Sequence, residues 1–251
     1  MDPASGARVA LLDGFALELD GSRSCPATDD LPHGVQRLVA HLSLAGHPTR
    51  GTIAGQLWPD VPEVHAHGSL RSALWRLHKV VPGLVETSRS ALGLAAGVRV
   101  DVRELTAWAA GVLDPTAGPE GLRAAGAALE GELLPGWYDD WVLLERERLR
   151  QLRMHALEML AERLVRAGRY GEAIQVAFTA VRDEPLRESA HRVLIRAHLA
   201  EGNVAEALRE YDTFREMLAE ELGVRPTAQM RDLVLTADRA RQGMGGRPRP
   251  A

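Results

Sequence analysis

The chain has 251 residues and a formal net charge of −4, and its 45% apolar and 25% charged residues are typical of a globular protein with room for two modest domains. It has no apolar run of the ~18 residues that a membrane-spanning helix needs, and Met1-Asp2-Pro3 does not begin a secretion signal. The single cysteine, Cys25, excludes an internal disulfide and cannot form a zinc site by itself, so we expect a cytoplasmic protein.

The first part of the chain predicts a small sheet followed by two helices. Residues 8–22 alternate apolar and polar side chains around Asp13-Gly14, the pattern of two short antiparallel strands joined by a turn. Apolar residues then recur at helical spacing over residues 35–42. Thr49 is placed to cap a second, short helix that ends at Trp58-Pro59.

Residues 67–79 predict a third helix with an apolar face and a basic face. The apolar face consists of Leu70, Ala73, Leu74, Leu77 and Val81. The opposite face consists of Ser72, Trp75, Arg76 and Lys79, with Arg71 and His78 on the flanks. No Asp or Glu occurs between Glu63 and Glu86, so this polar face carries positive charge only. Such a face suits a helix that binds nucleic acid, and the periodicity by itself is equally typical of a solvated surface helix.

A β-hairpin is predicted directly after the third helix. Pro82-Gly83 ends that helix, and apolar residues then alternate on both sides of the polar turn 87–90. Strands, three helices and a hairpin follow one another in this order in a winged helix-turn-helix, in which the third helix reads DNA and the hairpin is the wing. We therefore predict an α+β winged helix-turn-helix domain that binds DNA over residues 1–100.

The second part of the chain predicts helices only. They span residues 103–113, 120–131, 140–167, 171–183, 187–201, 204–221 and 227–242. An offset of 34 residues, the period of the tetratricopeptide repeat, aligns Gly168 with Gly202 and Ala173 with Ala207. Because such helix pairs bury their faces only against neighbouring pairs, we predict one all-α tetratricopeptide-like domain over residues 101–242, followed by a disordered tail over residues 243–251.

Three groups of motifs, taken in order, resemble a known family. They are Leu57-Trp58-Pro59 with Leu70-Arg71 and Arg76-Leu77; Gly131-Glu-Leu-Leu-Pro-Gly136 with Asp140-Trp141-Val142 and the run Glu145-Arg-Glu-Arg-Leu149; and Glu221-Leu-Gly-Val-Arg-Pro226. Over about residues 8–242 the chain resembles the Streptomyces antibiotic regulatory protein family, whose members join an OmpR-type winged helix to a bacterial transcriptional activation domain. The resemblance implies a transcriptional activator that binds direct repeats at promoters, contacts RNA polymerase and controls an antibiotic gene cluster.

The third helix supplies most of the predicted DNA-binding residues. We expect Arg76 and Ser72 to contact base edges, Arg76 because a guanidinium bonds both O6 and N7 of guanine. Lys79 and Arg71 are expected on phosphates, with a salt bridge inside the protein as the alternative for Arg71. The sequence leaves two roles open for Trp75: it contacts a sugar or a thymine methyl group, or it packs as a lid on its own domain's core.

Further contacts are predicted outside the third helix and near its end. Arg50 and Thr52 stand at the start of the second helix, where free backbone N–H groups favour phosphates. Arg89 stands in the hairpin turn, either to enter a minor groove or as part of a solvated tip. The family often has arginines where this chain has His78 and Lys79, which leaves room for a different base preference.

We predict no enzymatic activity, no cofactor and no metal. The chain lacks a Gly-x-Ser-x-Gly elbow, a His-Glu-x-x-His helix and a phosphate-binding Gly-x-x-x-x-Gly-Lys loop, so we also expect a short family member without the ATPase module of larger relatives. Three histidines lie close together in this region but have no cysteine or carboxylate cluster beside them, so we expect capping and phosphate contact rather than a metal site; they are His65, His67 and His78.

The expected partners are double-stranded promoter DNA, RNA polymerase by resemblance, and a second copy of the chain on DNA. Two other functions stay open. One is a helical-repeat adaptor that binds a protein or peptide in its concave groove, with the first domain as a docking module. The other is a repressor of the same build, which the residues do not separate from an activator.

Overall fold

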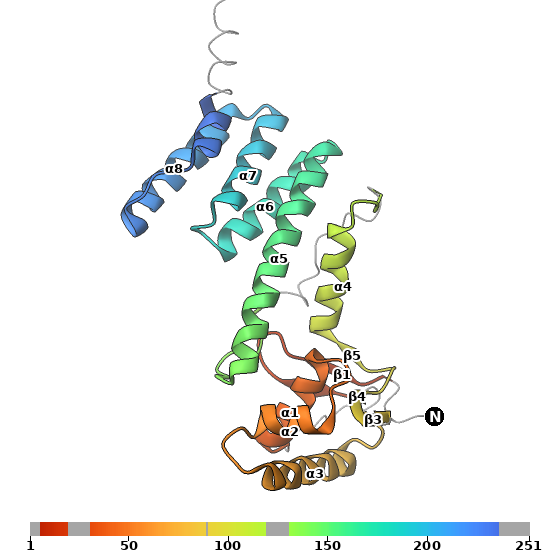
Figure 1. Ribbon diagram of the computed structural model, residues 1–251. Coiled ribbons are helices and arrows are strands. Elements are labelled where there is room, and N and C mark those ends of the chain that lie inside the picture. The colour runs from red at the N-terminus through yellow and green to blue at the C-terminus, as the bar shows by residue number, and fades with distance from the viewer. Residues whose placement is uncertain (1–5, 20–30, 89, 119–130, 236–251) are drawn as a thin grey trace, which may run out of the picture. The chain divides into compact units, whose positions relative to one another are not determined.

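The computed structural model describes residues 6–19, 31–88, 90–118 and 131–235 (Figure 1). The chain divides into two compact units: unit 1 comprises residues 1–108 and 125–151, and unit 2 comprises residues 109–124 and 152–251. Helices α4 (Asp101–Leu113) and α5 (Asp140–Arg166) contribute residues to both units. The predicted tail and almost all of the helix predicted over 120–131 lie outside the described residues. The domain limits inferred from the sequence, with a boundary at residue 100, stay a prediction.

Unit 1 begins with a small sheet that the alternating pattern predicted in part. Strands β1 (Arg8–Ala10) and β2 (Ala16–Glu18) pair antiparallel, with Val9 opposite Leu17. Asp13 and Gly14 connect them with positive φ angles of 61° and 137°, the region that a tight turn requires. A third strand, β5 (Arg99–Val100), pairs parallel with β1. The local pattern did not predict this pairing, because it joins segments about 90 residues apart.

Three helices follow the sheet: α1 (His33–Leu44), α2 (Arg50–Leu57) and α3 (Glu63–Val80). The third begins four residues before the predicted start at residue 67, because Pro62 serves as its N-cap and the Pro62 carbonyl accepts the N–H groups of His65 and Ala66 (2.8 and 3.0 Å). Its buried face consists of Ala66, Leu70, Ala73 and Leu77. These side chains join those of α1 and the sheet in one apolar core, so α3 is anchored along one side only.

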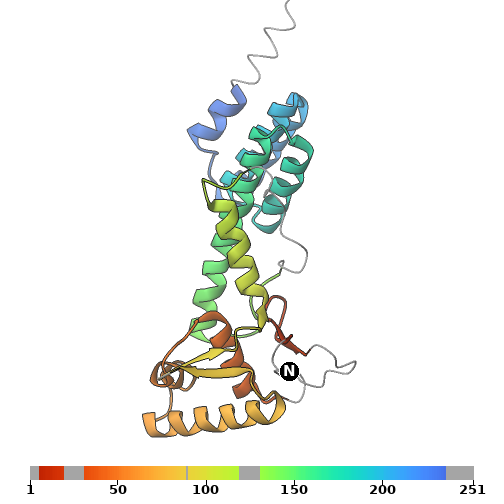
Figure 2. The same ribbon diagram turned by 90° about the vertical axis from the view of Figure 1, so that its right-hand side faces the viewer.

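The hairpin β3 (Val85–Ser88) and β4 (Ala91–Leu94) is fixed beside the start of α2. The N–H of Leu92 donates to the Pro48 carbonyl (3.0 Å), and the N–H of Arg50 donates to Ser90 (3.3 Å). Gly93 lies directly against His47, since a Cβ atom at this position would lie 2.6 Å from the His47 ring. Figure 2 shows α3 along its length at the outer edge of unit 1, with the hairpin at its side. The backbone bonds therefore hold the hairpin and α2 as one support for α3.

Residues at the start of α4 and α5 complete the core of unit 1. The buried Asp101 carboxylate accepts the N–H groups of Leu11, Leu12 and Val102 (2.8, 2.9 and 2.7 Å), and burial raises the pKa of Asp101 against the lowering effect of these bonds. Arg37 of α1 forms an ion pair with Asp139. Four apolar residues from 131–151 lie in the same buried cluster as Val9 and Leu70: Leu133, Leu134, Val142 and Leu149.

Unit 2 contains the helical repeat that the offset of 34 residues predicted. After α5 come α6 (Tyr170–Asp183), α7 (Glu188–Glu201) and α8 (Val204–Leu222), and residues 228–235 are again helical. The aligned glycines both have left-handed φ angles, 72° at Gly168 and 94° at Gly202. The aligned alanines Ala173 and Ala207 are both buried, as a close crossing of two helices requires. The two copies therefore occupy equivalent structural positions.

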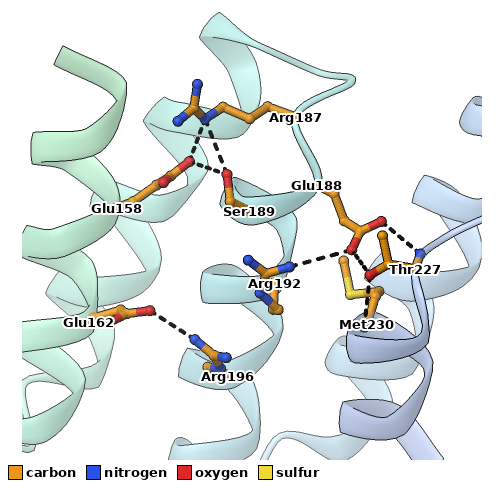
Figure 3. A network of polar contacts seen from close by, with 9 residues as sticks. All are labelled: Glu158, Glu162, Arg187, Glu188, Ser189, Arg192, Arg196, Thr227 and Met230. Carbon is orange, nitrogen blue, oxygen red and sulfur yellow. Dashed lines mark hydrogen bonds and ion pairs between the residues drawn. The ribbon is translucent and has the colours of Figure 1, made fainter. Parts of the chain in front are cut away.

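Polar contacts link elements of unit 2 that do not follow one another directly in the chain. They join Arg187 to Glu158, Arg196 to Glu162, and the N–H of Thr227 to Glu188 (2.6, 2.8 and 2.9 Å; Figure 3). These contacts connect α5 with α7, and α7 with the segment that follows α8. No helix of the described part of the chain is both long enough and apolar enough to cross a bilayer.

Candidate nucleic-acid interface

The outward face of α3 is exposed along its length. Arg71, Ser72, Arg76 and Lys79 are all exposed, and Trp75 has 59% of its surface open to solvent. Residues 72, 75, 76 and 79 are spaced by three and four positions, which places them on one side of a helix. The structure thus brings together five of the predicted DNA-binding side chains on a single surface.

The arginines and the lysine that the structure describes in unit 1 fall into two groups. Seven arginines bond to a carboxylate or to a backbone carbonyl: Arg8, Arg37, Arg99, Arg103, Arg146, Arg148 and Arg150. The side chains of Arg50, Arg71, Arg76 and Lys79 form no ion pair or hydrogen bond with any residue that the structure describes. All four of these residues belong to α2 or α3.

A groove of about 750 Å³ runs beside the N-terminal half of α3. Arg71, Ser72 and Arg76 line one side of it, and Trp58 and Val35 form part of its apolar floor. Because the predicted base-contacting residues open into this groove, the surface is concave next to the helix rather than flat.

A smaller pocket of about 170 Å³ lies between the C-terminal half of α3, the start of α2 and the hairpin. Arg50, His78 and Thr87 each line it from a different element, above the apolar side chains of Leu74 and Leu77. One guanidinium, one imidazole and one hydroxyl therefore converge there, which are groups that bond phosphate oxygens.

The start of α2 has the predicted cap. The Thr49 side chain accepts the N–H of Thr52 (3.2 Å), and the two hydroxyls lie 2.9 Å apart. Thr52 is exposed and Arg50 is half-buried. Arg89 lies outside the described residues, so its predicted place in the wing stays a prediction.

Sequence reasoning gave no role to two residues of this surface, Ser69 and Thr87. Ser69 lines the larger groove together with His65, and Thr87 lines the smaller pocket together with His78. Ser69 and His65 continue the row of Arg76 and Ser72 at spacings of three and four. Thr87 is a residue of the hairpin whose contact with α3 depends on tertiary packing.

The histidines of α3 do not gather into one site. His67 Nε2 lies 3.6 Å from Glu63 Oε1 one turn earlier, while His65 lines the larger groove and His78 the smaller pocket. Within the described ranges, no group of three or more His, Cys, Asp or Glu side chains is arranged to hold a metal ion.

Comparison with known proteins places the chain among transcription regulators. Residues 99–235 match the family described as the bacterial transcriptional activator domain. The regulatory protein AfsR of Streptomyces coelicolor is 30% identical over 204 residues, which cover 76% of this chain and 20% of that protein. AfsR of Streptomyces griseus is 29% identical over 217 residues, which cover 76% of this chain and 21% of that protein. The chain thus spans about a fifth of the length of these curated relatives.

A solved structure has a similar fold. Mycobacterium tuberculosis EmbR, in complex with a low affinity phosphopeptide, matches with a TM-score of 0.72 and 22% identity, over 93% of this chain and 65% of that chain. The likeness shows the fold, and it agrees with a winged helix-turn-helix followed by a helical domain.

Proposed function

The chain belongs to the Streptomyces antibiotic regulatory proteins, a family of transcription regulators, and from this premise we propose that it binds promoter DNA sequence-specifically and activates transcription. The observation that carries the proposal is the set of four cations on α2 and α3, Arg50, Arg71, Arg76 and Lys79, that have no ion pair with any described residue. Neutralising phosphates with Lys and Arg releases counterions and supplies much of the affinity for DNA. An exposed helix with cations on one side and an anchored apolar side is what entry into the major groove requires.

In the proposed complex the outward face of α3 lies in the major groove. Arg76 and Ser72 contact base edges, and Arg71 and Lys79 contact phosphates on either side. Arg50 and Thr52 contact the backbone near the start of α2, and Arg89 of the wing reaches toward a minor groove. Support comes from the exposure of the α3 side chains and from the absence of acidic partners for Arg50, Arg71, Arg76 and Lys79 among the described residues.

The finer parts of the proposal come from the family. Two copies bind direct repeats near a promoter, recruit RNA polymerase and control a secondary-metabolite gene cluster. The support is the match of residues 99–235 to a transcriptional activator domain and the similarity to AfsR of two Streptomyces species.

The decisive experiment selects DNA fragments from the host genome with the full chain and then measures equilibrium binding of the selected DNA. The double variant R71A/R76A should bind at least tenfold more weakly, since each good base or phosphate contact is worth about 1–3 kcal/mol. The matched control is R148A, which removes an exposed arginine of unit 1 that pairs with Glu145. Equal affinity of the wild type and R71A/R76A would rule out α3 as the DNA-binding helix.

Two alternatives have different outcomes. A helical-repeat adaptor would bind no DNA, or would associate with it in a way that salt does not affect. A repressor would bind the same DNA but lower the yield of transcript when added to purified RNA polymerase and promoter. Transcription in vitro with and without the protein therefore separates activation from repression.

A further inference from the structure

Trp75 differs from every other tryptophan of the chain. Trp58, Trp108, Trp137 and Trp141 all pack against the core of unit 1. Trp75 is 59% exposed and lies among the outward residues of α3. Its indole therefore does not serve as a lid on the core, and its apolar surface faces the solvent on the surface assigned to DNA. Tryptophan supplies a large apolar contact area and is enriched where proteins meet their partners.

Lys79 holds this indole in place. The Lys79 ammonium lies 3.9 Å from the centre of the Trp75 ring, one helical turn further along α3. A cation over the face of an indole is attracted by the ring's quadrupole. Lys79 has no carboxylate partner in the described part of the chain, and its ammonium contacts the Trp75 ring instead. One face of the ring is thus covered by a charge, while 59% of the residue's surface stays open to solvent.

We propose that Trp75 and Lys79 form one unit that recognises a thymine, with the indole against the C5 methyl group and the ammonium on a neighbouring phosphate. Thymine is the base that presents an apolar group in the major groove. An indole has apolar faces and a single N–H donor, so it suits that methyl group better than the hydrogen-bonding edges of guanine or cytosine. The inference rests on the proposed function, because it requires α3 to lie in the major groove.

The test replaces each thymine of a selected operator, one at a time, by deoxyuridine, which removes only the C5 methyl group. Wild-type protein should bind about fourfold more weakly at one or two positions, because burying one methyl group is worth about that factor. Trp75→Ala should bind the thymine and deoxyuridine duplexes equally. Trp75→Phe keeps an aromatic face and should keep part of the preference.

Two further variants separate the two halves of the unit. Lys79→Met removes the charge but keeps an apolar arm, and it should weaken binding to the thymine and deoxyuridine duplexes by the same factor. Tyr138→Ala removes an aromatic residue of unit 1 that is 79% exposed, and it should leave the preference unchanged. Because Trp75 is not part of the core, its variants should keep the circular dichroism and melting temperature of the wild type.

The inference is overturned if no thymine-to-deoxyuridine replacement changes wild-type binding. It is also overturned if Trp75→Ala keeps the preference, since another residue would then contact the methyl group or the indole would pack on a sugar. These results leave the proposed function intact. Failure of the wild type to bind any genomic fragment would instead contradict the proposed function itself.

Discussion

At the scale of single residues, Arg76 is the side chain best placed to determine base specificity. It is exposed at the middle of the outward face of α3, lines the 750 Å³ groove with Ser72, and has no acidic partner among the described residues. Arg76→Ala should weaken the binding free energy for the selected operator by about 1–3 kcal/mol. It should also relax the preference at one base pair. Binding to a panel of operators mutated at single positions would reveal the relaxed position. A loss spread evenly over all sequences would instead place Arg76 on a phosphate.

Lys79 and Arg71 are both expected to contact phosphates through their charge. Each lies on or beside the outward face of α3, and each should neutralise one phosphate. Arg71→Ala and Lys79→Ala should therefore weaken binding to specific and to non-specific DNA to a similar extent. Each should also reduce the magnitude of the slope of log K against log salt concentration by about one. Titrations at several salt concentrations measure this slope, with R148A as the control of unchanged slope. An unchanged slope in Arg71→Ala would show that Arg71 does not neutralise a phosphate.

The individual cations of α3 were predictable because the segment contains no acidic residue after Glu63. The exposure of Trp75 was not predictable. Helical periodicity shows on which side of the helix a residue lies, but not whether neighbouring elements cover that side. The start of α3 was not predictable for a different reason. The proline that caps α3 lies at residue 62, so the helix begins earlier than its apolar pattern indicates and includes His65.

At the scale of elements, His41 joins three helices of unit 1. Its side chain is buried on α1, and its Nε2 lies 2.5 Å from Gln56 Oε1 of α2. Its ring packs edge-on against Trp141 of α5, with 5.4 Å between the ring centres. Burial lowers the pKa of His41 below its ordinary value of 6.5, although the bond to Gln56 acts in the opposite direction. The folded state thus favours the neutral ring, while the unfolded chain takes up a proton more readily.

The stability of unit 1 should therefore depend on pH through His41. Its contribution is complete above about pH 6.5 and is lost as the pH falls below that value toward the lower pKa of the folded state. The loss is at most about 1.4 kcal/mol per pH unit for one proton. Denaturant unfolding between pH 7.5 and 5 should show this slope in the wild type and a shallower one in His41→Leu. Parallel curves for the two proteins would assign the acid sensitivity to other groups.

The local sequence pattern predicted the helices and strands more completely than the contacts between them. The alternation over residues 8–22, the helical spacing of the three helices and the hairpin after Pro82-Gly83 each predicted an observed element. The parallel pairing of β5 with β1 and the entry of Leu133, Leu134 and Val142 into the core of unit 1 were not predicted. Both depend on contacts between residues distant in sequence, which no local period encodes.

At the scale of the whole molecule, the two units have separate clusters of buried residues. The core of unit 1 includes the inward face of α3. A cluster in unit 2 joins α7, α8 and the helical segment 228–235 around Phe214. The Phe214 ring stacks on His191, with 4.1 Å between the ring centres. The 34-residue offset predicted equivalent positions in this repeat, such as Ala173 and Ala207, because each copy must bury the same face against its neighbour.

Phe214→Ala should test whether DNA binding and activation belong to different units. The side chain is fully buried, so its truncation should destabilise unit 2 by about 3–5 kcal/mol and lower its melting temperature by on the order of 15 °C. Because α3 and its supports belong to unit 1, the affinity for the selected operator should stay within about twofold of the wild type. Above the lowered melting temperature, transcription in vitro should fall although the promoter remains occupied. Full activation under those conditions would show that unit 2 is not needed to recruit RNA polymerase, and loss of operator binding would show that the two units are not independent.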